Sequence, residues 1–226
     1  MAPESPTLGV PDWSLNADNF IDYYFDGRLA ADVLLRHDIQ SFSLRSGANP
    51  GADTIYLDIE NLRLAPLLQT LPGTPPVSAL LSTALSTDFS GGYPVVGGTV
   101  RLDSTLYDGR WVGNMALALD YRQLSSTLMQ AGATLAVDTL DAVDLSLRYD
   151  TDTLSAEPLD LKVGFPAFPL SVANAFLPDD MARIEGLLRG DVSLMGRIDA
   201  PRMAGRLSVD EGRAVIPMVG ASVRFS

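Results

Sequence analysis

The chain has 226 residues, 46% of them hydrophobic and 19% charged, with a formal net charge of −12. This acidic balance argues against binding to nucleic acid or to anionic lipid headgroups, because both need clustered Lys and Arg. The absence of cysteine excludes disulfides and thiol chemistry. No run of 18 apolar residues occurs, so the sequence predicts no transmembrane segment. The start of the chain lacks the basic and apolar regions of a signal peptide, and we expect any export signal or anchor to lie outside this sequence.

Alternation of apolar and polar residues with period two predicts strands along most of the chain. The clearest runs, in chain order, are 54–64 (TIYLDIENLRL), 111–121 (WVGNMALALDY), 143–150 (VDLSLRYD) and 159–165 (LDLKVGF). Asp-Gly pairs at 26–27 and 108–109 are typical of tight hairpin turns. Two segments break the alternation and predict short helices near 65–71 and 170–177, each followed by a proline.

The order of these features recurs along the chain at a nearly constant offset. A short helix, an apolar strand, a Pro-x3-Gly segment and a second strand appear twice in the same order. The landmarks and their counterparts are Val77 and Ile184, Pro94 and Pro201, Gly98 and Gly205, and the Leu-Pro pairs at 71–72 and 177–178. The first three pairs lie 107 positions apart and the last pair 106. We expect the four Pro and Gly residues to form structural turns without a chemical role.

An internal repeat of about 107 residues explains these offsets. We predict a disordered lead-in over 1–10, the tail of a preceding β repeat over 11–56, a complete β repeat over 57–163, and a truncated second β repeat over 164–226. The fold class is then all-β, an elongated and curled sheet with a taco-like groove. Period-two spacing alone leaves open whether the apolar faces close on each other as a sandwich or line an open trough.

The sequence shows no catalytic constellation. His37 is the only histidine, so neither an ordinary zinc site nor a Ser-His-Asp triad with a G-x-S-x-G turn can be assembled. Asp179-Asp180 suits a capping role, and Asp150-Thr151-Asp152 suits a turn, with weak calcium binding as the alternative. A pair of glycosidase carboxylates remains open, because carboxylates are abundant. We predict no enzyme, no cofactor and no metal site.

The apolar side of the predicted strands is the remaining candidate for function. Period-two spacing places one set of side chains on one common interior. These are Val100, Leu102, Met115, Leu117, Leu119, Leu145, Leu147, Leu161, Val163, Val192, Leu194, Leu207 and Val209. We interpret them as candidate lining residues of a lipid-binding groove.

The second half of the chain resembles a known family. The matching features are FPLSVANAFLP at 168–178, the glycine-spaced run from Gly186 to Gly196, and DAPRMAGRLSVDEG at 199–212. They are similar to the carboxy-terminal repeat region of the TamB family, the translocation and assembly module proteins among the AsmA-like inter-membrane bridges. The first repeat looks like the unit before it, so the resemblance covers roughly residues 55–226.

The resemblance implies a long periplasmic protein, anchored in the inner membrane and reaching toward the outer membrane. It implies a U-shaped sheet whose apolar groove carries phospholipid acyl chains. It also implies a part in the assembly or secretion of outer-membrane proteins, with an outer-membrane β-barrel of the TamA/BamA type as partner. We therefore expect a lipid conduit. The alternatives are a chaperone-like assembly module and a closed β-sandwich binding module, for instance for carbohydrate.

Overall fold

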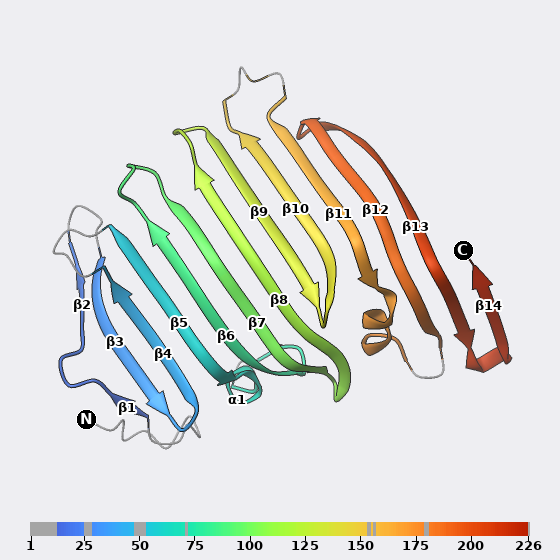
Figure 1. The fold of residues 1–226 in the computed structure, drawn as a ribbon, viewed down its shortest axis with the longest axis horizontal. Helices are drawn as coiled ribbons and strands as arrows, with labels where there is room; N and C mark the ends of the chain where they lie inside the picture. Colours follow the sequence, from blue (N-terminus) through green and yellow to red (C-terminus); the bar gives the residue numbers. More distant parts are fainter. Residues whose placement is uncertain are drawn as a thin grey trace.

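The computed structural model describes residues 13–24, 29–47, 53–70, 72–152, 155, 157–178 and 181–225. These residues form one 14-stranded sheet, and every strand pair in it is antiparallel (Figure 1). The strands are β1 (Ser14–Leu15), β2 (Phe20–Tyr23), β3 (Leu29–His37), β4 (Gln40–Ser46), β5 (Thr54–Arg63), β6 (Val77–Asp88), β7 (Val95–Tyr107), β8 (Arg110–Gln123), β9 (Leu128–Val137), β10 (Leu140–Asp150), β11 (Leu159–Pro169), β12 (Arg183–Arg197), β13 (Ala200–Ile216) and β14 (Ala221–Phe225).

Strand order in the sheet follows the order of the chain. From β3 onward each strand pairs with the next one, and both β1 and β2 pair with the outer edge of β3. Tight turns make this order possible. Asp108 and Gly109 join β7 to β8 with φ of 50° and 75°, the positive values that a two-residue hairpin turn favours. The Asp-Gly turn predicted at 108–109 is thus confirmed, whereas the one at 26–27 lies outside the described residues.

Short helices interrupt the sheet where the alternation of the sequence breaks. They are α1 (Leu64–Leu68) and the 3-10 helix η2 (Leu170–Ala175), and a further 3-10 turn, η3 (Pro217–Val219), precedes β14. Pro66 lies in the first turn of α1, where the missing N–H removes no helical hydrogen bond. The two helices predicted near 65–71 and 170–177 are therefore present, each slightly shorter than expected.

The hairpins β6–β7 and β12–β13 share one register at the 107-residue offset. Leu81 pairs with Leu102, and Leu188 pairs with Val209. The register shifts once in each hairpin, between 78 and 80 in β6 and between 185 and 187 in β12. Ser104 and Glu211 have φ of 54° and 53° at the equivalent places in the partner strands. The two strand pairs are equivalent, whereas the repeat boundaries over 11–56, 57–163 and 164–226 stay predictions, and residues 1–10 lie outside the described residues.

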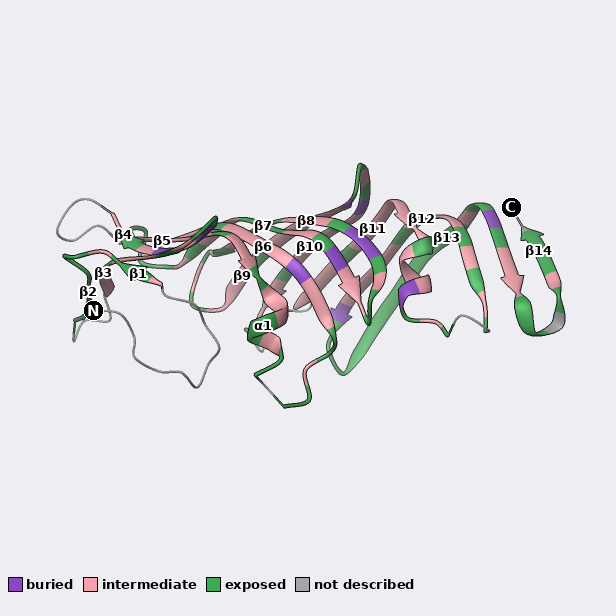
Figure 2. Cartoon of the chain, turned by 90° about the horizontal axis from the view of Figure 1, so that it is seen from below, coloured by how far each residue is buried: buried purple, intermediate pink, exposed green. Residues whose placement is uncertain are grey.

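The sheet is a single layer. Within the described residues the buried apolar side chains are small, mostly alanine and valine, and no large side chain is fully buried. Figure 2 shows the sheet as an arch with α1 on its inner side. The all-β, elongated and curled sheet predicted from the sequence is confirmed. The described residues place no second sheet against its apolar side, as a sandwich would require.

Candidate functional site

The predicted lining residues share one side of the sheet. In an antiparallel ladder, directly paired residues point to the same face. Leu102 pairs with Met115, Val100 with Leu117, and Leu161 with Leu194. Together with the alternation of faces along each strand, this pairing places all thirteen predicted residues on one side across β7 to β13. We call the side of the sheet that carries them the apolar face.

One row of directly paired residues crosses the apolar face from β3 to β13 without a polar side chain. It consists of Val33, Leu44, Leu57, Leu85, Gly98, Leu119, Ala133, Leu145, Val163, Val192 and Gly205. A second row, two residues along each strand, is uncharged throughout and holds Ser46, Ile55, Thr87, Val96, Tyr121, Ala131, Leu147, Leu161, Leu194 and Met203. The apolar face is therefore continuous across eleven strands.

The structure extends the lining beyond the residues that the sequence singled out. Ile55 and Leu57 on β5 and Leu85 on β6 belong to the same rows, as do Val33 and Leu44 further toward the amino terminus. Alternation is visible in β5, and it could have found Ile55 and Leu57. In β6 the same face carries Thr83 and Thr87, which hide the pattern.

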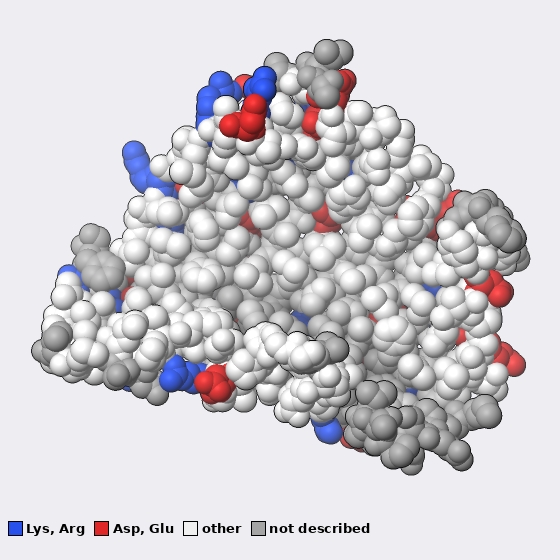
Figure 3. All heavy atoms as spheres, turned by 180° about the vertical axis from the view of Figure 1, so that it is seen from behind, with Lys and Arg blue, Asp and Glu red and all other residues white. Residues whose placement is uncertain are grey.

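The apolar face is open to the surroundings. Twelve of the thirteen predicted lining residues are half-buried, and Leu207 is 51% exposed. Met203, in the same strand, is 75% exposed. Figure 3 views this side of the molecule and shows it hollowed along its middle, with charged side chains mainly at its margin. Apolar surface of this extent without a covering layer is typical of a binding surface.

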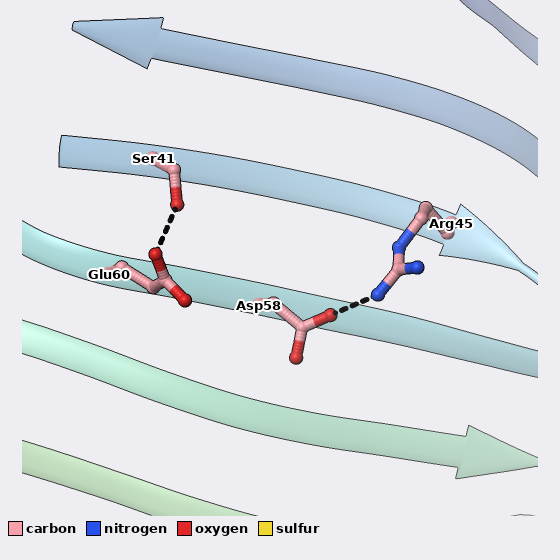
Figure 4. Close-up of polar contacts among 4 residues, drawn as sticks. All are labelled: Ser41, Arg45, Asp58 and Glu60. Carbon is pink, nitrogen blue, oxygen red and sulfur yellow. Dashed lines mark hydrogen bonds and ion pairs between the residues drawn. The ribbon is translucent and has the colours of Figure 1, made fainter. Parts of the chain in front are cut away.

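Neither of the two rows on the apolar face contains a charged side chain, and the strands carry charged residues on their opposite side, which we call the polar face. Arg45 forms an ion pair of 2.8 Å with Asp58 across β4 and β5, and Ser41 donates a hydrogen bond of 3.2 Å to Glu60 beside it (Figure 4). These side chains alternate along their strands with the lining residues Leu44 and Leu57. Exposed pairs of this kind contribute little to stability, typically up to about 1 kcal/mol. Their main effect is to make the polar face hydrophilic.

Groups with shifted pKa values lie at the ends of strands and in a turn, at the margin of the sheet. The backbone amide of Ser90, with its hydroxyl, holds the pKa of Asp88 below its ordinary value. Arg197 does the same for Asp199 through a hydrogen bond and its charge, and Asp199 in turn raises the pKa of Arg197. None of the three lies in the rows of the apolar face, so these shifts do not create a proton-transfer group there.

At one end of the strands, η2 connects the β7–β8 hairpin to β12. The rings of Tyr107 and Phe176 lie 4.7 Å apart, and the Arg110 guanidinium donates a hydrogen bond to the carbonyl of Leu177. The Asn174 side chain accepts a hydrogen bond of 2.8 Å from the amide of Ile184 and donates one of 2.9 Å to its carbonyl. These contacts fix the margin of the apolar face at this end.

The prediction of turns at the Pro-x3-Gly segments is wrong for three of the four residues. Gly98 and Gly205 lie inside β7 and β13, and Pro201 is the second residue of β13. Only Pro94 precedes its strand, where its carbonyl accepts a hydrogen bond of 3.1 Å from Gln123. The two glycines are required by the neighbouring strand, whose backbone approaches them too closely for a side chain.

The remaining sequence candidates form no site within the described residues. His37 ends β3, with its ring 5.8 Å from that of Trp13. The Asp150 carboxylate accepts a hydrogen bond of 3.0 Å from the amide of Asp152, as in an ordinary turn. Asp179 and Asp180 lie outside the described residues. In the part of the chain that the structure describes, no three acidic or histidine side chains gather as metal ligands would.

Comparisons with known proteins add no assignment. No protein-family model matches the chain, and neither a curated protein nor a solved structure matches it. Among the described residues no helix has the length and hydropathy needed to cross a membrane. The functional argument therefore depends on the apolar face.

Proposed function

We propose that this chain is a segment of a TamB-like bridge and that its apolar face carries phospholipid acyl chains between the inner and outer membranes. The observation that carries the proposal is the row from Val33 to Gly205, which crosses eleven strands without a polar side chain. Hydrocarbon in water costs about 0.8 kcal/mol per CH₂, so a 16-carbon chain costs on the order of 12 kcal/mol. A groove that shields the chain removes most of that cost.

The two rows also suit the movement of an acyl chain better than its tight binding at one place. Ten steps between neighbouring strands, at about 4.8 Å each, span on the order of 50 Å. Each step of the first row presents an aliphatic side chain or a glycine, so an acyl chain meets a similar surface along this path. No charge interrupts the rows, and a charge would force the hydrocarbon past a desolvated ion. Weak, uniform contact of this kind permits sliding without a tightly bound intermediate.

The cellular setting of the proposal follows from the resemblance of the repeats to the TamB family. In that setting the chain lies in the periplasm, and its parent protein is anchored in the inner membrane. A β-barrel of the TamA/BamA type in the outer membrane is the proposed partner.

Photo-crosslinking tests this function. A photoreactive amino acid replaces Leu117 or Leu207 in the full-length parent, and the captured material is identified by mass spectrometry after irradiation of cells. Ala118 and Ser208, the neighbours on the polar face, serve as matched control positions. We expect phospholipid at Leu117 and Leu207 and not at the controls. Capture of polypeptide without lipid at both positions would overturn the proposal.

Capture of polypeptide without lipid would instead support an assembly or chaperone-like module for outer-membrane or secreted proteins. One observation favours this candidate. The apolar face has no covering layer among the described residues, and apolar grooves of this kind bind amphipathic segments of other polypeptides.

A further inference from the structure

The turns at one end of the strands are acidic. Tight turns join β3 to β4, β7 to β8 and β9 to β10 at the lower end in Figure 1. Each of these turns holds an exposed aspartate with positive φ, namely Asp38, Asp108 and Asp138. We call this end of the strands the acidic rim. Its carboxylates repel an anionic group such as a phosphate.

The turns at the opposite end of β6 to β9 contain no charged residue. They are residues 89–94 between β6 and β7 and residues 124–127 between β8 and β9, at the upper end in Figure 1. We call these two turns the uncharged rim. Phe89, Tyr93 and Leu124 are exposed there, next to serine and threonine. Aromatic and hydroxyl groups side by side suit the boundary between hydrocarbon and water.

Short helices cover the inner side of the sheet at the acidic rim. Figure 2 shows α1 on this side, and η2 is held to the β7–β8 hairpin by the contact of Phe176 with Tyr107. The buried apolar side chains of β8 to β10 all lie near this end, and one residue of η2 is buried as well. They are Val112, Val137, Ala142 and, in η2, Ala175. The groove is therefore more closed at the acidic rim than at the uncharged rim.

Tyr121 and Tyr149 lie on the apolar face close to the other ends of β8 and β10, where both are half-buried. A tyrosine ring contacts hydrocarbon while its hydroxyl reaches polar groups, so tyrosine is enriched where a membrane meets water. From Tyr121 to Met115 the strand rises on the order of 20 Å. One layer of acyl chains, half of a bilayer core, is about 15 Å thick. A phospholipid tail therefore fits along the strand between these two residues.

We propose that each phospholipid lies along the strands, with its phosphate headgroup at the uncharged rim and the ends of its acyl chains toward the acidic rim. The headgroup then stays in water beside Tyr121, and the acyl chains run over Leu119 and Leu117 toward Met115. This inference rests on the lipid transport proposed above and adds the direction in which the lipid lies. A lipid that moves across the strands in this orientation carries its headgroup along one rim only.

Photoreactive phosphatidylethanolamine tests this direction. One probe carries a diazirine in the headgroup, and another carries it at the end of an acyl chain. Each is presented in vesicles to the whole chain, and the labelled residues are mapped by mass spectrometry after irradiation. We expect the headgroup probe to label residues 89–94 and 122–128, and the acyl probe to label residues near Met115 and Val137.

The labelling pattern separates the direction of the lipid from lipid binding itself. Headgroup labels around Asp108 and Asp138, with acyl labels still on the apolar face, would overturn the inference and leave the lipid function intact. Absence of acyl labels from the apolar face would contradict the lipid function, and this inference with it.

Two exposed turn positions give a matched charge test. Ser126→Asp adds a carboxylate to the uncharged rim, and Thr139→Asp adds one to the acidic rim. In 0.1 M salt a carboxylate about 6 Å from a phosphate weakens binding roughly two-fold, whereas a charge about 20 Å away is screened. With acyl-labelled phosphatidylglycerol we expect Ser126→Asp to raise Kd about two-fold and Thr139→Asp to leave it unchanged. Ser126→Lys should lower Kd by a similar factor. Equal Kd values for the two aspartate variants would overturn the proposed direction.

Discussion

Gly98 and Gly205, 107 positions apart in the sequence, lie against the neighbouring strand in the same way. A Cβ on Gly98 would stand 2.0 Å from the carbonyl oxygen of Ala84, and one on Gly205 would stand 2.3 Å from that of Asp191. Ala84 and Asp191 are themselves 107 positions apart. The close approach of strands thus recurs at the same offset, and it leaves no room for a side chain at either position.

Replacement of either glycine by alanine should destabilise the sheet. Gly98→Ala or Gly205→Ala forces the two strands apart, a strain that costs about 2 kcal/mol or more. For a chain of this size, that loss lowers the melting temperature by roughly 4–8 °C. Gly91→Ala is the matched control, because a Cβ there meets no atom within 4 Å. Circular dichroism melts check this, and unchanged midpoints for both variants would contradict the close approach of the strands at these glycines.

A charge on the apolar face should stop lipid movement without unfolding the chain. Leu117 is half-buried on an open face, so Leu117→Asp keeps contact with water and leaves the sheet folded. It places a charge in the path of the acyl chain, which then passes a desolvated ion. Phospholipid transfer by the full-length parent should fall to background. The parent with Ala118→Asp, one residue along on the polar face, should transfer phospholipid normally. Equal effects of the two substitutions would contradict the proposed lipid conduit.

The side-chain amide of Asn174 should be needed for the full stability of the fold. It donates to the carbonyl of Ile184 and accepts from the amide of the same residue. Asn174→Asp loses the donor and sets a carboxylate against the Ile184 carbonyl, which should cost about 1–3 kcal/mol. Asn174→Ala should cost a similar amount. Urea unfolding measures both, and full stability of Asn174→Asp would show that the donated hydrogen bond contributes nothing.

The contact of Tyr107 with Phe176 should hold the β7–β8 hairpin to η2. An aromatic pair of this geometry contributes about 0.5–1.5 kcal/mol beyond its buried area. A double-mutant cycle with Tyr107→Ala and Phe176→Ala should return a coupling energy in that range. Backbone amide hydrogen exchange at the tip of the β7–β8 hairpin should be faster in each single variant. The double variant should exchange only slightly faster than the single variants. Additive effects would mean that the rings do not interact in solution.

Sequence predicted most of the strands because one side of each strand is apolar. The run around Leu145 and Leu147 alternates without a break, and the structure gives it a strand over nearly the same residues. Helices at 65–71 and 170–177 were detectable for the complementary reason, since alternation fails there. The same periodicity places the thirteen lining residues on one side of the sheet, because each strand pairs with the next in a simple meander.

Features that depend on neighbouring strands were not predictable. Gly98 and Gly205 look like turn residues after a proline, but it is the approach of β6 and β12 that requires them. Ser104 and Glu211 adopt positive φ at register shifts, and neither residue type indicates this in the sequence. Thr83 on β6 breaks the apolar pattern although it lies on the apolar face. No local pattern reveals whether a second layer covers such a face.

The meander order has a mechanical consequence. Strands contact chiefly the partners to which they are hydrogen-bonded, and β1 and β14 lie at opposite ends of the molecule (Figure 1). Tension applied between those ends acts across the strands, so the hydrogen-bonded ladders between neighbouring strands carry it in series and the weakest of them separates first. Arrays held together by nearest-neighbour contacts come apart in successive steps. Pulled in this direction, the molecule unzips hairpin by hairpin and behaves as an extensible tether, whereas the same sheet resists shear along its strands.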